Sequence, residues 1–90
     1  MVDDFLKLAV VYYRNQRYQD CVEASRKALA MRPNLAEAWA NMAAAQHAMG
    51  QDEDAIVSLR EVLRLRPDMK FAQTDLDILL AQKKDKAASR

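Results

Sequence analysis

The sequence predicts an all-α fold in which antiparallel helix pairs repeat along the chain as an α-solenoid. The 90 residues include one glycine and two prolines, and none of the Asn-Gly or Asp-Gly pairs that favour tight β-hairpins. Strong helix formers such as Ala, Leu, Arg, Lys, Gln and Glu dominate instead. The stretches ALAMRPNL (28–35) and VLRLRPDM (62–69) match in character at every position but one, where Ala30 corresponds to Arg64, and their prolines lie 34 residues apart. The chain therefore contains one helix-pair unit repeated.

The first unit, residues 2–34, is predicted to hold two helices. Apolar residues at helical spacing, from Phe5 to Tyr12, predict the first helix over about 2–15. A second apolar face predicts the next helix over about 18–31, ending before Pro33. The joint between them is short, so the two helices must lie antiparallel. The residues of the second face are Tyr18, Cys21, Val22, Ser25, Ala28 and Leu29.

The second unit, residues 35–68, repeats this arrangement. Its first helix is predicted over about 35–48, with Asn34 as N-cap, Glu37 as its capping-box partner and Gly50 at its end. The acidic run 52–54 opens a helix over about 52–65, because the helix dipole favours negative charge in the first turn. Pro67 stands where that helix must stop.

A fifth helix is predicted over residues 69–83, with Asp68 as its cap. At the 34-residue offset it carries Gln73 and Asp77 where the second unit has Trp39 and Ala43. A terminal capping helix needs such a polar outer face, so this helix is expected to close the array. Residues 84–90 are expected to form a flexible, solvated basic tail.

The repeat resembles the tetratricopeptide repeat (TPR) family, whose 34-residue pattern has Trp, Leu, Gly or Ala, and Tyr on one helix. Its second helix carries Ala, Phe, Ala and Pro. The resemblance covers residues 2 to about 83, with departures at Gln46, in place of Tyr, and at Ser25, in place of the large aromatic. It is carried by Phe5, Leu8, Ala9, Tyr12, Cys21, Ser25, Ala28 and Pro33 in the first unit and by Trp39, Met42, Ala43, Gln46, Ala55, Leu59, Val62 and Pro67 in the second.

The TPR resemblance implies a concave groove lined by the first helix of each unit and by the last helix. Small and apolar residues form its floor, and a mixed-charge rim surrounds them, which is how protein-binding surfaces are built. We therefore expect a protein–protein interaction module that binds a peptide or helical segment. The groove residues are Leu6, Lys7, Val10, Tyr13, Arg14, Glu37, Ala40, Asn41, Ala44, His47, Phe71, Thr74, Asp75 and Ile78.

Two known TPR binding modes fit the sequence poorly. The subclass that clamps C-terminal carboxylates of chaperones uses Lys, Asn, Asn, Lys and Arg, of which only Asn41 is present. Asp75 would repel a carboxylate at the last of these positions. A second subclass holds an extended peptide by its backbone through a series of Asn side chains. Of this series only Asn41 is present, since Lys7 and Asp75 occupy the flanking positions. Chaperone tails are therefore not the expected partner.

The first helix supports an alternative function. Its apolar face covers a wide arc, because it includes Leu6, Val10 and Val11. A helix that caps the N-terminal end of an array would be more polar. The chain is therefore expected to be the C-terminal part of a larger protein or array, or a self-assembly or scaffolding segment that forms a homo-oligomer through this helix. A third hypothesis is an accessory domain of a larger enzyme.

The sequence holds no constellation for catalysis, a metal or a cofactor. His47 has no second His, Cys or suitable Ser nearby in the pattern, and Cys21 occupies a small, buried position. One glycine cannot build a phosphate loop. With 14 basic and 13 acidic residues, no nucleic-acid partner is expected. No apolar run approaches the ~18 residues of a membrane span, and no signal sequence precedes the repeat, so a soluble, cytoplasmic protein is favoured.

Overall fold

The computed structural model describes residues 1–88. Within that range it contains five α-helices and no strand, which confirms the predicted all-α fold class. No helix among these residues is long and apolar enough to cross a membrane. The helices are α1 (Val2–Arg14), α2 (Tyr18–Met31), α3 (Ala36–Ala48), α4 (Asp52–Leu65) and α5 (Lys70–Ala88).

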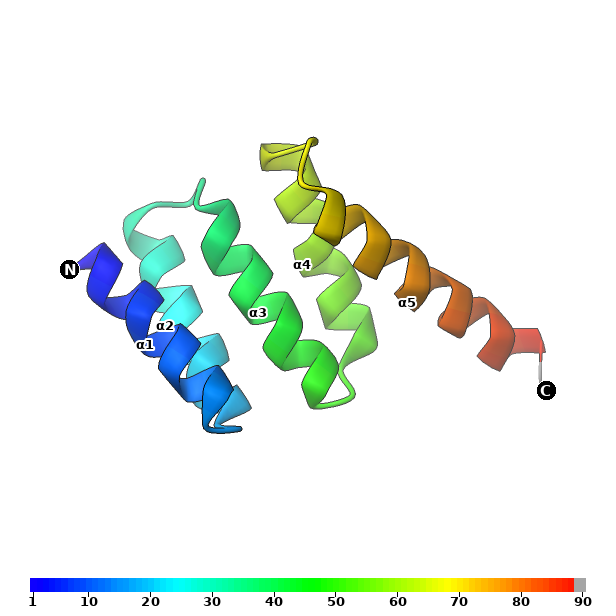
Figure 1. Cartoon of the computed structure of the whole chain (residues 1–90), viewed down its shortest axis with the longest axis horizontal. Coiled ribbons are helices and arrows are strands. Elements are labelled where there is room, and N and C mark those ends of the chain that lie inside the picture. The colour runs from blue at the N-terminus through cyan, green and yellow to red at the C-terminus, as the bar shows by residue number, and fades with distance from the viewer. Residues whose placement is uncertain (89–90) are drawn as a thin grey trace.

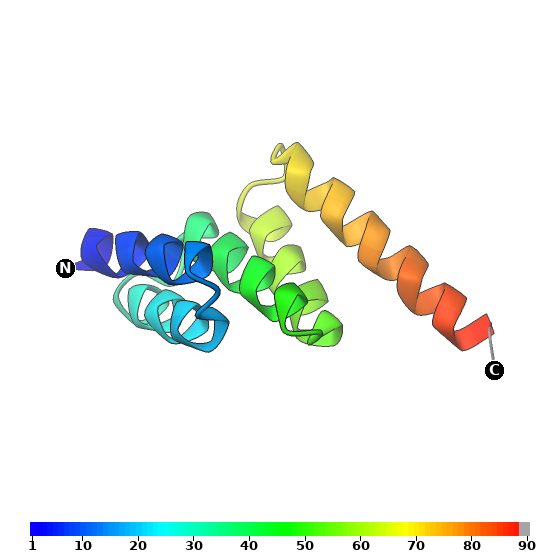
Figure 2. The ribbon, with the colours of Figure 1, turned by 60° about the horizontal axis from the view of Figure 1, so that its bottom comes forward.

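The helices stack in chain order, each packed against the next (Figure 1). In addition, α1 contacts α3, the first helix of the following unit. Figure 2 shows α1 lying over α2, so the first helices of the units share one face and the second helices lie behind them. The result is an elongated solenoid of 46 × 27 × 18 Å.

The core consists of two clusters joined by Trp39, which packs against both. The first cluster lies among α1, α2 and α3, and the second among α3, α4 and α5. Small residues at the helix crossings let the backbones approach closely. The buried members of the first cluster are Ala9, Cys21, Val22, Ala24, Met42 and Ala45; those of the second are Ala36, Ala43, Ala55, Ile56, Leu59, Val62, Ala72, Leu76 and Leu79.

Helices α1 and α3 end in the same hydrogen-bonded turn. After α3, the N–H of Gly50 donates to the carbonyl of His47 (2.9 Å) and the N–H of Gln51 to that of Gln46 (2.8 Å). This is a Schellman motif, and Gly50 takes the left-handed conformation that it requires, with φ 77°. After α1, the N–H groups of residues 16 and 17 make the corresponding bonds, with Gln16 at φ 61°. Gln16 is thus the structural counterpart of Gly50.

The predicted N-caps of α3 and α5 are wrong. Asn34 lies in the turn that follows Pro33, two residues before α3, and Leu35 takes the N-cap position without a side-chain hydrogen bond. Asp68 has the equivalent place, two residues before α5 begins at Lys70. Each proline places a two-residue turn ahead of the helix, so the capping position falls one residue later than the sequence pattern indicated.

Helix α5 is longer than predicted, since it runs through Ala88 rather than ending near residue 83. The expected tail over 84–90 is therefore helical as far as residue 88, and residues 89–90 lie outside the described range. The stretch AQKKDKAA (81–88) consists mostly of strong helix formers and has no glycine or proline to end the helix. Lys83 also contacts Glu53 at the start of α4, with 3.1 Å between Nζ and Oε1.

Candidate functional site

Two adjoining hollows lie on the face formed by α1, α3 and α5. The first, here called the α1–α3 hollow, is lined by Leu6, Lys7, Val10, Val11, Arg14, Glu37, Ala40, Asn41, Met69 and Phe71. The second, the α3–α5 cleft, has a volume of about 230 Å³ and is lined by Tyr13, Ala40, Ala43, Ala44, His47, Leu59, Phe71, Asp75, Ile78 and Leu79. Ala40 and Phe71 line both, so the two hollows form one continuous groove.

The structure brings together 13 of the 14 residues predicted for the groove. Thr74 is the exception: it is exposed on α5 and lines neither hollow. Helical spacing puts Phe71, Asp75 and Ile78 on one stripe, and Thr74 falls at its outer edge. The sequence did not predict five further lining residues, which are Val11, Ala43, Leu59, Met69 and Leu79.

The groove combines a low floor with exposed apolar walls. Ala40 and Ala44 project only a methyl group each from α3. On α5, Phe71 and Ile78 remain 51% and 49% exposed, respectively. Large apolar side chains that stay half-exposed beside a hollow are typical of surfaces that bind another molecule.

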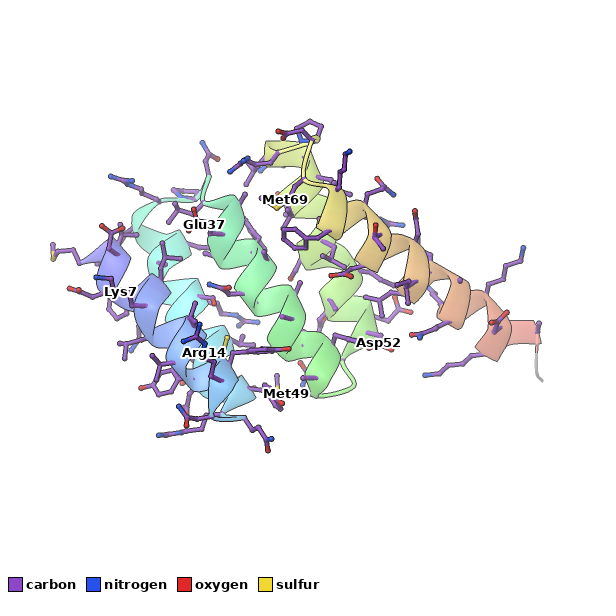
Figure 3. The ribbon with its side chains drawn as sticks, in the orientation of Figure 1. Lys7, Arg14, Glu37, Met49, Asp52 and Met69 are labelled. Atoms are coloured by element: carbon purple, nitrogen blue, oxygen red, sulfur yellow. The ribbon has the colours of Figure 1, made fainter. Side chains whose placement is uncertain are left out.

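Charges are distributed unevenly along the groove. Lys7 and Arg14 project from α1, and Glu37 stands in the first turn of α3 (Figure 3). Asp75 lines the α3–α5 cleft on the opposite side. None of these four side chains takes part in an ion pair within residues 1–88. The groove therefore carries two basic groups on α1, one acidic group at the start of α3 and one acidic group on α5.

His47 has a partner that the sequence did not reveal. Its Nδ1 lies 2.9 Å from Oδ1 of Asp52, across the turn that links α3 to α4. Both side chains are partly exposed, at 54% and 31%, respectively. The contact fixes the imidazole at the lower end of the cleft. The sequence feature that could have indicated this contact is the five-residue spacing between His47 and Asp52 across the turn. Apolar periodicity within a single helix gives no information about such a contact.

Buried polar groups lie behind the groove. Ser58 donates a hydrogen bond to Oε1 of Gln46 (2.7 Å), and both residues are buried. Gln46, which departs from the TPR pattern, thus has a specific partner on α4. The Ser25 hydroxyl, also buried, makes no hydrogen bond of ordinary geometry in the described chain.

Cys21 is fully buried and unsuited to nucleophilic chemistry. Its Sγ lies 3.6 Å from the carbonyl oxygen of Asn41. Burial raises the pKa of the thiol above its ordinary value of 9.0 and outweighs the nearby Ser25 hydroxyl, which lowers it. Across residues 1–88, no group of three or more His, Cys, Asp or Glu side chains is arranged to hold a metal ion.

A solenoid of helix pairs with such a groove is a protein–protein interaction repeat module, and sequence comparisons identify its family. Two tetratricopeptide repeat models match the chain, one over residues 5–35 and the other over residues 25–57. The chain belongs to the tetratricopeptide repeat family, which confirms the resemblance read from the sequence. Tetratricopeptide repeats are a non-catalytic interaction fold.

Two curated relatives contain a similar stretch. Superkiller protein 3 of Saccharomyces cerevisiae is 32% identical over 69 residues, which are 77% of this chain and 5% of that protein. A probable UDP-N-acetylglucosamine–peptide N-acetylglucosaminyltransferase, SEC, of Arabidopsis thaliana is 35% identical over 54 residues, 60% of this chain and 6% of that protein. The chain thus spans about one-twentieth of the length of either relative.

Proposed function

We propose that the groove binds a peptide or helical segment of another protein. The observation that carries this proposal is the half-exposure of Phe71 and Ile78 opposite the small residues Ala40 and Ala44. A partner segment that enters the groove removes these apolar surfaces from water, at roughly 25 cal/mol per Å² of apolar area buried. The unpaired rim charges then orient the segment and select its sequence.

The proposal is tested with a displayed library of random peptides selected against the whole chain. Selected peptides are synthesised, and their affinities for Ile78→Asp and for Val57→Asp are compared by fluorescence anisotropy. Val57 is the matched control, because it is 59% exposed on α4 and lines neither hollow. We expect Ile78→Asp to weaken binding about tenfold or more, since covering an apolar side chain contributes on the order of 1.5–3 kcal/mol. Equal losses in the two variants would contradict groove binding.

A second candidate function is self-assembly through α1. The repeat allows a direct comparison, because Leu8 and Val11 of α1 occupy the positions of Met42 and Ala45 in α3. In α3 these positions are covered by α2 and are 4% and 0% exposed, whereas Leu8 and Val11 are 41% and 49% exposed. A second copy of the chain that covers this surface would bury it as α2 buries the equivalent surface of α3.

The oligomeric state distinguishes this second function from peptide binding. Light scattering over a concentration series is expected to show a dimer that the double variant Leu8→Glu with Val11→Glu reduces to a monomer. Val57→Glu adds one charge on α4, outside both hollows, and is expected to leave the dimer intact. A wild-type chain that stays monomeric at the highest concentration tested would refute self-assembly through α1.

A further inference from the structure

The repeat symmetry of the solenoid is broken at α5. In a regular array, α5 would lie against α3 as α3 lies against α1. Instead, α3 contacts α1, whereas α5 packs on α4 and makes no comparable contact with α3. Figure 1 shows α5 running away from α3 towards the C-terminal end. The α3–α5 cleft opens at this divergence.

The cleft reaches the hydrophobic core. Leu59 of α4 and Leu79 of α5 line it, although each is only 3% exposed and belongs to the second core cluster. On the α3 side, Ala40, Ala43 and Ala44 are too small to fill the space between the helices. A side chain that enters the cleft therefore meets core residues on its inner end and the rings of Tyr13 and Phe71 nearer the surface.

The size of the cleft suits one side chain rather than a small-molecule ligand. Sites for drug-sized ligands have volumes of roughly 300–1,000 Å³, and this cleft has about 230 Å³. Its lining is alanine, leucine, isoleucine and aromatic carbon, with Asp75, His47 and the Tyr13 hydroxyl as the polar members. Because His47 already contacts Asp52, Asp75 is the charge available to a partner.

We infer that the α3–α5 cleft is an anchor pocket for one Leu, Ile, Met or Phe side chain of the bound segment. The same segment carries Lys or Arg beside the anchor, facing Asp75, and Asp or Glu further along, facing Lys7 and Arg14. This inference rests on the proposed function and specifies its partner. The polarity follows from the charges that line the groove. Asp75 is the acidic group of the cleft, whereas in the α1–α3 hollow the two basic groups of Lys7 and Arg14 outnumber the one acidic group of Glu37, so a segment bound in the reverse direction would place like charges together.

The test uses the peptides selected against the whole chain. We expect them to share one large apolar residue with a basic residue on one side and an acidic residue on the other. Replacing the apolar residue of the peptide by Ser should weaken binding about tenfold or more. This change leaves the protein untouched, so a loss cannot come from unfolding. Ala44→Leu, which fills the cleft, should weaken the same peptides similarly while circular dichroism and thermal unfolding stay unchanged.

Charge reversal tests the polarity. Asp75→Lys should weaken binding roughly two- to fivefold, the size expected for an exposed charge pair. A peptide in which the basic residue is replaced by Glu should regain affinity for Asp75→Lys. Asp68→Lys is the matched control, because it makes the same change in net charge in the turn before α5, outside the cleft. The control should bind both peptides as the wild-type chain does.

Three results would overturn the inference. Peptides that depend on Ile78 but tolerate both the Ser replacement and Ala44→Leu would refute the anchor and leave groove binding intact. Peptides that bind equally well to Asp75→Lys would refute the polarity. A dimer that Ala44→Leu abolishes would show that a second copy of the chain occupies the cleft. If instead no selected peptide depends on Ile78, the proposed function itself fails.

Discussion

The turn after α1 offers a sharp test of the internal symmetry. Gln16 adopts φ 61° where its counterpart Gly50 adopts φ 77°. The left-handed conformation costs an L-residue roughly 1–2 kcal/mol, because Cβ approaches the following carbonyl oxygen. Glycine avoids this cost but loses about 0.5–1 kcal/mol more backbone entropy on folding. Gln16→Gly should therefore raise the free energy of unfolding by about 0.5–1 kcal/mol.

Thermal and urea unfolding measure this effect. In a domain of this size, 1 kcal/mol corresponds to a shift of about 4–8 °C in Tm, so Gln16→Gly should raise Tm by about 2–8 °C. The reverse change, Gly50→Gln, should lower stability by a similar amount. No heavy atom lies within 4 Å of the position that a Cβ would take at Gly50. The loss of stability in Gly50→Gln would therefore come from the backbone conformation and not from a steric clash.

A matched control separates relief of strain from a general effect of glycine. Gln51→Gly makes the same chemical change at an exposed residue whose φ is −89°. Gln51 is the N-cap of α4, a position that tolerates glycine, so with no strain to relieve we expect at most the entropic loss of about 0.5–1 kcal/mol. If Gln16→Gly destabilises the chain as Gln51→Gly does, the assignment of strain to Gln16 is refuted. The swap of Gln16→Gly with Gly50→Gln should be close to the wild type in stability.

Three further predictions concern the core. Ser25→Ala should stabilise the chain by up to about 1 kcal/mol, because it removes a buried hydroxyl that makes no hydrogen bond of ordinary geometry. Ser58→Ala should instead cost about 1 kcal/mol by leaving Gln46 unpaired, and urea unfolding that gave both variants the same sign would contradict this. Ala55→Leu should cost about 1–3 kcal/mol in the same assay, since residue 55 is fully buried, and an unchanged midpoint would refute close packing there. Burial raises the pKa of Cys21 in the folded chain above its value of 9.0 in the unfolded chain, so the unfolded chain loses the thiol proton at a lower pH. The contribution of Cys21 to the free energy of unfolding is therefore fully present below pH 9.0 and falls as the pH rises further. Urea midpoints measured from about pH 7 to about pH 10 should lose this alkaline decline in Cys21→Ala.

The sequence could predict the helix pairs because their positions follow from local chemistry. Apolar spacing, two prolines and one glycine mark the elements, and the 34-residue offset assigns equivalent positions. The groove was implied by the resemblance to the tetratricopeptide repeat, and helical periodicity then placed its residues on one stripe of each helix; 13 of the 14 line the two hollows. The same offset aligns Gln16 with Gly50, so the turn after the first helix could have been predicted to adopt the conformation of the turn after the third.

The divergence of α5 could not be predicted in this way. Periodicity tells which face of a helix is apolar, but the angle between helices depends on how side chains of different sizes interlock. Leu59, one of the residues that carry the repeat pattern, lies in the core, yet it also lines the cleft because α5 leaves α3 uncovered. The contact between His47 and Asp52 depends likewise on the three-dimensional path of the turn after α3.

Helix α3 shows how one short segment can serve stability and binding separately. Its fully buried residues Ala38 and Ala45 set the spacing between helices, so a larger side chain at either would force the helices apart. Ala40 and Ala44 lie on the groove side of the same helix and are partly exposed. A larger side chain there would occupy the groove. The alanines of this helix are therefore limited in different ways. Those on the buried side must stay small for the helices to pack, whereas those on the groove side can change to suit the partner.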